Sequence, residues 1–154
     1  GDDVKTEEIK IADELANIIS ERKDEVNTGV DLHMHSMLTE GFSAHVNKKM
    51  LCRMVNILLD NAIKNTTSGY IIIKAEANTK LLNIAVEDTG IGIAPEEADR
   101  IFERFVKLDS FKEGLGLGLT LCRMLAKRIG GDVILDTNYA GPGARFIINL
   151  PIKQ

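Results

Sequence analysis

A chain of 154 residues is long enough for one domain with a buried core and too short for two. Its net charge of −4 argues against a nucleic-acid binder, and no apolar run approaches the roughly 20 residues of a membrane helix. The chain starts with Gly1 and not with Met, so we expect a piece of a longer protein, without a signal peptide. Cys52 and Cys122 both lie in helical apolar patterns, which indicates small buried side chains in a reducing compartment and neither a disulfide nor a metal pair.

The first third of the chain predicts two strands on either side of one helix. Residues 1–8 are charged and predict a linker, followed by a short strand near 9–11. Asp13 is a suitable N-cap for a helix that runs to about Val26. Apolar and polar residues then alternate over 30–35, which is typical of a strand with one face in water.

The middle third predicts a long helix followed by a hairpin. Asn47 is a suitable N-cap for a helix over 48–65. The apolar stripe of this helix consists of Leu51, Met54, Val55, Leu58 and Ala62. Strands over 70–77 and 81–88 follow, joined by a polar turn. Pro95 is well placed in the first turn of a short helix that ends near residue 102.

The last third predicts a loop, one more helix and a second hairpin. The polar segment over 104–113 predicts the loop, and a glycine-rich run over 114–118 then opens a helix over 119–129. Strands over 133–136 and 144–150 form the last hairpin. Several helices beside hairpin-connected strands predict an α+β fold of two layers, with residues 1–154 as a single domain.

Asp88 is the strongest single candidate for a ligand-binding side chain. It ends an apolar strand pattern and is followed by Gly90 and Gly92. Its carboxylate can accept a hydrogen bond from an exocyclic amine, and a turn without side chains lets a flat ring lie against the backbone. An ordinary strand-to-loop turn has the same pattern, so that alternative stays open at this point.

Asn61 and Lys64 lie about one turn apart at the edge of the apolar stripe of the 48–65 helix. An amide oxygen is a hard ligand of the kind that Mg²⁺ prefers, and a lysine one turn away can meet a phosphate as a point charge. The alternative is a solvated helix flank. The histidines predict no metal site, because they are scattered without ligand spacing: His33, His35 and His45.

The glycine-rich run over 114–118 predicts an anion site. Glycines that lead into a helix leave free backbone N–H groups at the positive end of its dipole. The segment before them carries Arg104, Lys107 and Lys112, which is the local positive charge that an acidic phosphate-binding protein needs. We expect this segment to be a lid over phosphates, and a flexible loop before a helix is the alternative.

The order of these motifs resembles that of one known family. An asparagine–lysine helix, Asp-x-Gly-x-Gly, Phe-x-x-Phe over 102–105, a basic segment and Gly-x-Gly-x-Gly follow one another. Over about 9–152 the chain resembles the catalytic and ATP-binding domain of bacterial sensor histidine kinases, in the superfamily of gyrase, mismatch-repair ATPases and heat-shock chaperones. The resemblance implies a Bergerat-type sandwich, with a mixed, mostly antiparallel sheet covered on one face by helices, and ATP and Mg²⁺ as cofactors.

The resemblance also implies roles for individual residues. Asn61 corresponds to the family's magnesium ligand, and Asp88 to the residue that binds the adenine amine. The implied catalytic residues are Asn61, Lys64 and Lys107. The implied nucleotide-binding residues are Asn61, Lys64, Asp88, Gly90, Gly92, Ile93, Phe105, Lys112, Gly114, Leu115, Gly116, Leu117, Gly118 and Leu119.

The sequence departs from the family pattern in two respects. The family usually has a polar residue four positions before the magnesium asparagine, and this chain has Ile57 there. Asn56 does not replace it, because five residues of helix turn it by about 140° from Asn61. Ile57 also supplies no general base, which argues against a gyrase-like ATPase. In addition, no histidine of the chain has the context of the family's phosphoacceptor.

The function implied by the resemblance is a protein-histidine kinase domain of a two-component system. It would transfer the γ-phosphoryl group of ATP to a histidine on a separate, dimeric domain of the same parent protein. The downstream partner would be a response-regulator receiver domain, and the location would be the cytoplasm. We expect this fragment alone to bind ATP with little autophosphorylation, and no nucleic-acid partner. Two alternatives stay open: an ATP-sensing interaction module without phosphotransfer, which Ile57 favours, and an anti-sigma-factor-like serine kinase of the same superfamily.

Overall fold

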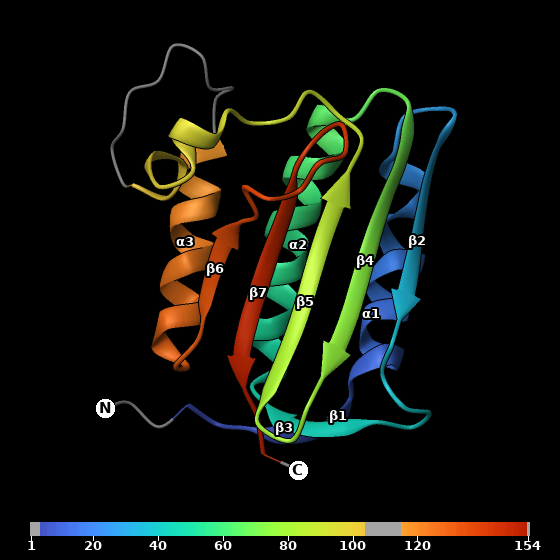
Figure 1. Ribbon diagram of the computed structural model, residues 1–154. Coiled ribbons are helices and arrows are strands. Elements are labelled where there is room, and N and C mark those ends of the chain that lie inside the picture. Colours follow the sequence, from blue (N-terminus) through green and yellow to red (C-terminus); the bar gives the residue numbers. More distant parts are fainter. Residues whose placement is uncertain (1–3, 104–114, 154) are drawn as a thin grey trace.

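The computed structural model describes residues 4–103 and 115–153. Its main sheet has five strands in the order β2-β4-β5-β7-β6, and the helices cover one face of it (Figure 1). The strands of this sheet are β2 (Val30–Ser36), β4 (Gly69–Ala77), β5 (Leu81–Asp88), β6 (Asp132–Leu135) and β7 (Arg145–Pro151). The helices are α1 (Ile11–Arg22), α2 (Lys48–Asn65) and α3 (Leu115–Arg128). A separate antiparallel pair consists of β1 (Glu7–Lys10) and β3 (Ser43–Val46).

The main sheet is mixed, as expected. β2 is parallel to β4, and all other neighbours are antiparallel. The strands alternate between the two faces, so that Ile71 and Ile73 of β4 point towards the helices and are fully buried. The opposite helix layer buries Leu51, Met54 and Leu58 of α2 completely. The predicted two-layer α+β sandwich is therefore confirmed.

Local sequence signals located α2 and the first hairpin correctly. Asn47 is the N-cap of α2, and its side-chain oxygen accepts a hydrogen bond of 2.8 Å from the backbone N–H of Met50. β4 and β5 pair antiparallel, with Ile71 opposite Asp88. The chain therefore brings Asp88 to the same end of the molecule at which α2 finishes, the top in Figure 1.

The predicted starts of two helices were wrong. α1 begins at Ile11, directly after β1, so Asp13 lies in its first turn and Lys10 is the N-cap residue. The helix also ends at Arg22, where the chain continues as a 3₁₀ turn, Lys23–Glu25. Ile11 is fully buried. Burial of this side chain in the first turn favours a helix that starts before Asp13, and it outweighs the capping preference of Asp13.

α3 begins at Leu115 and not at residue 119, so Gly116 and Gly118 belong to the helix. A Cβ placed on Gly118 would lie 3.5 Å from Cγ2 of Ile57, which shows how closely α3 approaches α2. Tertiary packing of this kind overrides the low helix propensity of glycine. The helix predicted after Pro95 consists of two 3₁₀ turns, Pro95–Glu97 and Arg100–Phe102. The loop predicted over 104–113 lies outside the described residues.

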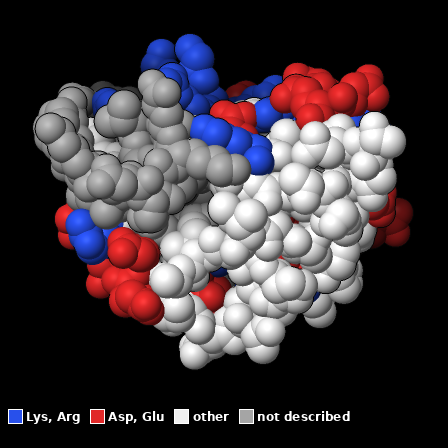
Figure 2. All heavy atoms as spheres, turned by 90° about the horizontal axis from the view of Figure 1, so that it is seen from above, with Lys and Arg blue, Asp and Glu red and all other residues white. Residues whose placement is uncertain are grey.

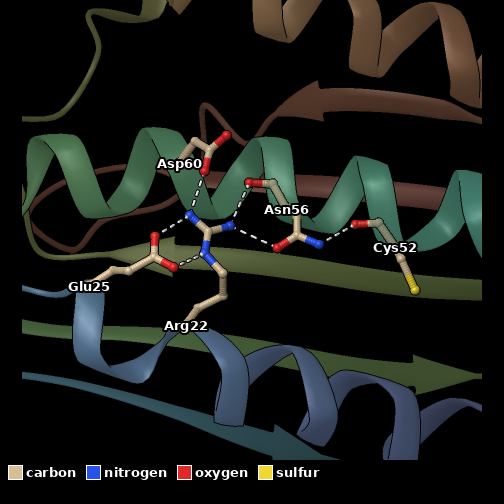
Figure 3. A network of polar contacts seen from close by, with 5 residues as sticks. All are labelled: Arg22, Glu25, Cys52, Asn56 and Asp60. Carbon is tan, nitrogen blue, oxygen red and sulfur yellow. Dashed lines mark hydrogen bonds and ion pairs between the residues drawn. The ribbon is translucent and has the colours of Figure 1, made fainter.

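Arg22 joins the end of α1 to α2 (Figure 3). Its guanidinium donates to the side-chain oxygen of Asn56 at 2.7 Å and to Asp60 at 2.5 Å, and it also pairs with Glu25. Asn56 in turn donates to the backbone oxygen of Cys52 at 2.9 Å. The Arg22 side chain is only 15% exposed, so this polar network is shielded on one side from water.

Arg22→Met is expected to lower the free energy of unfolding by about 1–2 kcal/mol, the sum of two solvent-screened ion pairs and the hydrogen bond to Asn56. The matched control is Arg100→Met. Arg100 is half exposed, and its ion pair with Glu97 is long, at 3.8 Å, and therefore weak. That change should stay within about 0.5 kcal/mol. Chemical denaturation followed by circular dichroism measures both, and equal effects of the two substitutions would contradict the role of the network.

Candidate functional site

The C-terminal ends of α2 and β5, which lie at the top of the molecule in Figure 1, contribute to the lining of a small pocket. Its lining comes from three separate segments of the chain: Asn61, Asn65, Asp88, Ile91, Gly92, Ile93, Ala144 and Phe146. The pocket therefore unites Asp88 with Asn61, the two residues that the sequence assigned to opposite ends of one nucleotide. Its volume is about 10 Å³, which is room for about one water.

Asp88 is held by the backbone on one side. Only 5% of the residue is exposed, and its Oδ1 accepts hydrogen bonds from the N–H of Gly90 at 2.8 Å and of Ala144 at 3.3 Å. Within the described part of the chain, no protein group donates to Oδ2. The backbone thus fixes the carboxylate and leaves one oxygen to accept a hydrogen bond from a ligand.

Burial raises the pKa of the Asp88 carboxyl above its ordinary value, because the charged form loses water. The N–H groups of Gly90 and Ala144 partly offset this rise in pKa, and the charge of Glu87 adds to it. Burial of a carboxylate costs part of the hydration of its charge. A carboxylate in such a pocket is found in binding sites more often than in structural turns.

Two glycines are required where backbone segments meet around Asp88. A Cβ on Gly90 would lie 2.1 Å from the backbone oxygen of Asn65, which also accepts a hydrogen bond of 3.2 Å from Ile91. A Cβ on Gly143, where φ is +84°, would lie 2.1 Å from the backbone oxygen of Asp88. Gly143 lies in the turn that the sequence assigned to a tight hairpin, and its contact with Asp88 agrees with that structural role.

Asn61 lies on the pocket side of α2. It is 8% exposed, and its Nδ2 is buried without a hydrogen-bond partner among the described residues. A buried amide without a partner is a candidate for contact with a bound ligand. Lys64 is exposed one turn further along the helix. The described residues contain no cluster of three or more His, Cys, Asp or Glu side chains that could hold a metal. An ion bound near Asn61 would therefore depend on phosphate oxygens and water, as Mg²⁺ commonly does.

Some predicted site residues cannot be placed. Phe105, Lys107, Lys112 and Gly114 lie outside the described residues. Leu115, Gly116 and Leu117 form the first turn of α3, which starts at the same end of the molecule as the pocket. The Leu119 side chain is fully buried, so only its backbone could meet a nucleotide.

Asn56 turns away from the pocket, towards Arg22 and Cys52. Its side chain thus lies where the rotation of about 140° from Asn61 along the helix places it. Ile57 is half buried and packs against Gly118, across the interface between α2 and α3.

Sequence reasoning missed four of the pocket residues: Asn65, Ile91, Ala144 and Phe146. Asn65 carried one usable signal, since it follows Asn61 by four positions and so lies on the same face of α2. Ala144 and Phe146 come from β7 and the turn before it, and only strand pairing brings them to Asp88.

Figure 2 shows the molecule from this end. Basic side chains are present on the described surface, acidic ones gather mainly towards its edges, and a largely uncharged area occupies the lower right. The surface is thus mixed in sign, although the chain is acidic overall.

No helix in the described ranges is both long and apolar enough to span a membrane.

Residues 46–154 match the family model described as histidine kinase-, DNA gyrase B- and HSP90-like ATPase. Among curated proteins, the sensor histidine kinase RppB of Synechocystis sp. is 32% identical over 145 residues, which cover 90% of this chain and 32% of that protein. The sensor protein SrrB of Staphylococcus aureus is 39% identical over 99 residues, 61% of this chain and 17% of that protein. The chain thus spans a third or less of the length of these relatives.

Solved structures agree with the sequence comparison. The full-length structure of ShkA in complex with AMPPNP superimposes with a TM-score of 0.87 at 25% identity, over 99% of this chain and 32% of that one. The catalytic domain of histidine kinase ThkA, in a nucleotide-free form, has a TM-score of 0.79 at 20% identity and covers 97% of this chain and 99% of that one. The ThkA match shows the fold, and it extends over almost the whole of an isolated catalytic domain.

Proposed function

This chain belongs to the family of histidine kinase-, DNA gyrase B- and HSP90-like ATPases, as a catalytic and ATP-binding domain of the two-component sensor histidine kinase type, and we propose that it transfers the γ-phosphoryl group of ATP to a histidine on a separate domain of its parent protein. The acceptor domain would be dimeric, and a response-regulator receiver domain would take the phosphoryl group next. The parent protein would place this domain in the cytoplasm, where ATP is available.

The observation that carries the proposal is the setting of Asp88. Two backbone N–H groups hold its Oδ1, and its Oδ2 stays available in a pocket that also contains Asn61. In this arrangement Asp88 accepts a hydrogen bond from the adenine amine, and Ile93 lies beside the ring. The phosphates then extend towards Asn61 and the first turn of α3, whose backbone N–H groups favour an anion.

Catalysis would depend on position and charge. The side-chain oxygen of Asn61 would hold Mg²⁺, which neutralises phosphate charge when it is bound. Lys64 would meet the phosphates directly, and we assign the same role to Lys107 and Lys112. The acceptor histidine and its general base would come from the separate domain, so the residues of this chain orient ATP and stabilise charge but do not activate the nucleophile.

Ile57 favours a second candidate function, an ATP-sensing interaction module without phosphotransfer. The side chain occupies the position four residues before Asn61, and it packs against Gly118 where the family usually has a polar group. A module of this kind would bind ATP through the same pocket and would leave its phosphates intact. Adding a phosphoacceptor domain separates the two candidates, since only the kinase forms phosphohistidine.

Isothermal titration of the wild-type protein with Mg-ATP and Mg-ADP tests the proposal. We expect binding of both nucleotides, and Asn61→Ala should weaken binding of Mg-ATP by about 10-fold or more, because an amide contact to a charged metal–phosphate group is lost. With radiolabelled ATP, the chain alone should incorporate little phosphate, and a phosphoacceptor domain supplied in trans should become labelled. Strong labelling of the isolated chain would contradict the division of roles, and absence of ATP binding would overturn the proposal as a whole.

A further inference from the structure

Asn65, the last residue of α2, contributes an unused hydrogen-bond acceptor to the pocket. Its Nδ2 donates to the backbone oxygen of Asn61 at 2.8 Å. Its Oδ1 is buried and has no hydrogen-bond partner among the described residues. A buried amide oxygen without a partner is costly, so a native site that keeps one calls for an explanation.

The orientation of this amide follows from its contacts. A backbone carbonyl only accepts hydrogen bonds, so the group that faces the oxygen of Asn61 must be the NH₂ group. The amide oxygen of Asn65, a residue that lines the pocket, is then the atom left without a partner. The backbone of Asn65 is also held in place, because its oxygen accepts a hydrogen bond from Ile91 and lies against Gly90. The acceptor is therefore fixed relative to the turn that follows Asp88.

We infer that Asn65 is a nucleoside-recognition residue, whose amide oxygen accepts a hydrogen bond from a donor of the bound adenosine, beside the one that Asp88 accepts. The donor is either the second N–H of the exocyclic amine or the 2′-hydroxyl of the ribose. This inference rests on the proposed function. Two acceptors in one pocket favour a nucleoside that presents donors, and a purine with a carbonyl at the same place would leave both acceptors unpaired.

The chain offers a matched control for this residue. Asn83 of β5 also has a buried Oδ1 without a partner among the described residues. It lies on the other face of the sheet, however, since its neighbours Leu82 and Ile84 point towards the helices and are fully buried. There it lines a separate groove of about 360 Å³ that does not include Asp88.

The first experiment compares Mg-ATP binding by the wild type, Asn65→Leu, Asn65→Ala and Asn83→Leu in isothermal titration. Both Asn65 variants should bind ATP about two- to tenfold more weakly, as expected for one lost hydrogen bond, and Asn83→Leu should bind as the wild type does. Asn65→Ala removes the amide with a smaller change of shape, so it decides the outcome if Asn65→Leu does not fold. Thermal unfolding without ligand checks folding. Both Asn65 variants lose the hydrogen bond from Nδ2 to the backbone oxygen of Asn61, so a loss in stability equal to that of one hydrogen bond is expected in each.

Two analogues identify the donor: 2′-deoxy-ATP, and the triphosphate of purine riboside, which lacks the exocyclic amine. The difference between the wild type and Asn65→Ala should disappear with the analogue that lacks the partner of Asn65, and persist with the other. Wild-type binding of ATP with no loss in the Asn65 variants would overturn this inference alone, as would a loss of the same size with both analogues. No binding of ATP by the wild type would overturn the proposed function, and this inference with it.

Discussion

Asp88→Asn is expected to weaken binding of Mg-ATP by about 10- to 150-fold, as for the loss of a hydrogen bond to a charged group. The amide can keep its oxygen towards the N–H groups of Gly90 and Ala144, as Oδ1 does now. It then presents an NH₂ group to the adenine amine, so that two donors face each other. Isothermal titration measures the loss, and equal affinities of the variant and the wild type would show that Asp88 does not bind the base.

The same substitution should not destabilise the unliganded protein, and we expect it to be stabilising at neutral pH. Because burial raises the pKa of Asp88, the folded state holds the proton more tightly than the unfolded state. The bound proton adds to the free energy of unfolding. This contribution is fully present below the ordinary pKa of an aspartate and is lost as pH rises through the raised pKa of the folded state. The advantage of Asp88→Asn should thus grow with pH across that interval and be small below it, which urea unfolding at several pH values can measure.

Glu87→Gln is the matched control for Asp88→Asn. Glu87 is the preceding residue and equally buried, at 5% exposed, but it points to the other face of the sheet. There it pairs with Lys74 at 3.1 Å and with Arg145 at 3.4 Å. Neutralising it should lower stability, because two cations lose their partner, and leave ATP affinity unchanged. The two neighbouring carboxylates should therefore show opposite effects on stability, and only the change at Asp88 should weaken ATP binding.

Gly90→Ala is expected to destabilise the protein by about 2–4 kcal/mol, which for a domain of this size lowers Tm by roughly 5–15 °C. The added Cβ would lie 2.1 Å from the backbone oxygen of Asn65, and backbone cannot rotate away as a side chain can. The turn and the end of α2 must then separate, which breaks the hydrogen bond from Ile91 to Asn65. Because that contact joins Asp88 to the α2 side of the pocket, ATP affinity should also fall, by about 10-fold or more, on the scale of a lost hydrogen bond and shifted contacts.

Gly41→Ala separates this effect from the general cost of replacing a glycine. Gly41 has a φ of +72°, but a Cβ there would meet no atom within 4 Å. The expected cost is about 1–2 kcal/mol from backbone conformation alone, with ATP affinity unchanged. Differential scanning calorimetry and titration of both variants provide the comparison. Similar losses of affinity in the two would mean that the contact between Gly90 and Asn65 does not shape the pocket.

The parts of the fold that the sequence predicted correctly depend on local signals. α2 has its cap at Asn47 and an apolar stripe along its whole length, and the β4–β5 hairpin alternates between buried and exposed residues. These patterns are complete within about 20 residues of chain, so neighbouring residues alone determine them. The family could also be inferred in this way, because it depends on the order of short motifs.

The start of α3 could not be predicted in the same way. Glycine has a low helix propensity, and a run of glycines therefore reads as a loop before the helix. In the structure Gly118 is part of α3, and its missing side chain lets the helix approach Ile57 of α2. The gain comes from a residue about 60 positions away, which no local pattern contains.

The sequence by itself singled out Asp88, at the end of a strand and before two glycines, as the candidate to bind the base. Only the tertiary structure decided how that side chain is held and what lies beside it. Ala144 reaches Oδ1 through the pairing of β5 with β7, and Asn65 reaches the pocket because Gly90 lets the turn lie against the end of α2. Both contacts join segments far apart in the chain, and close packing of backbone, which depends on the whole fold, brings them together.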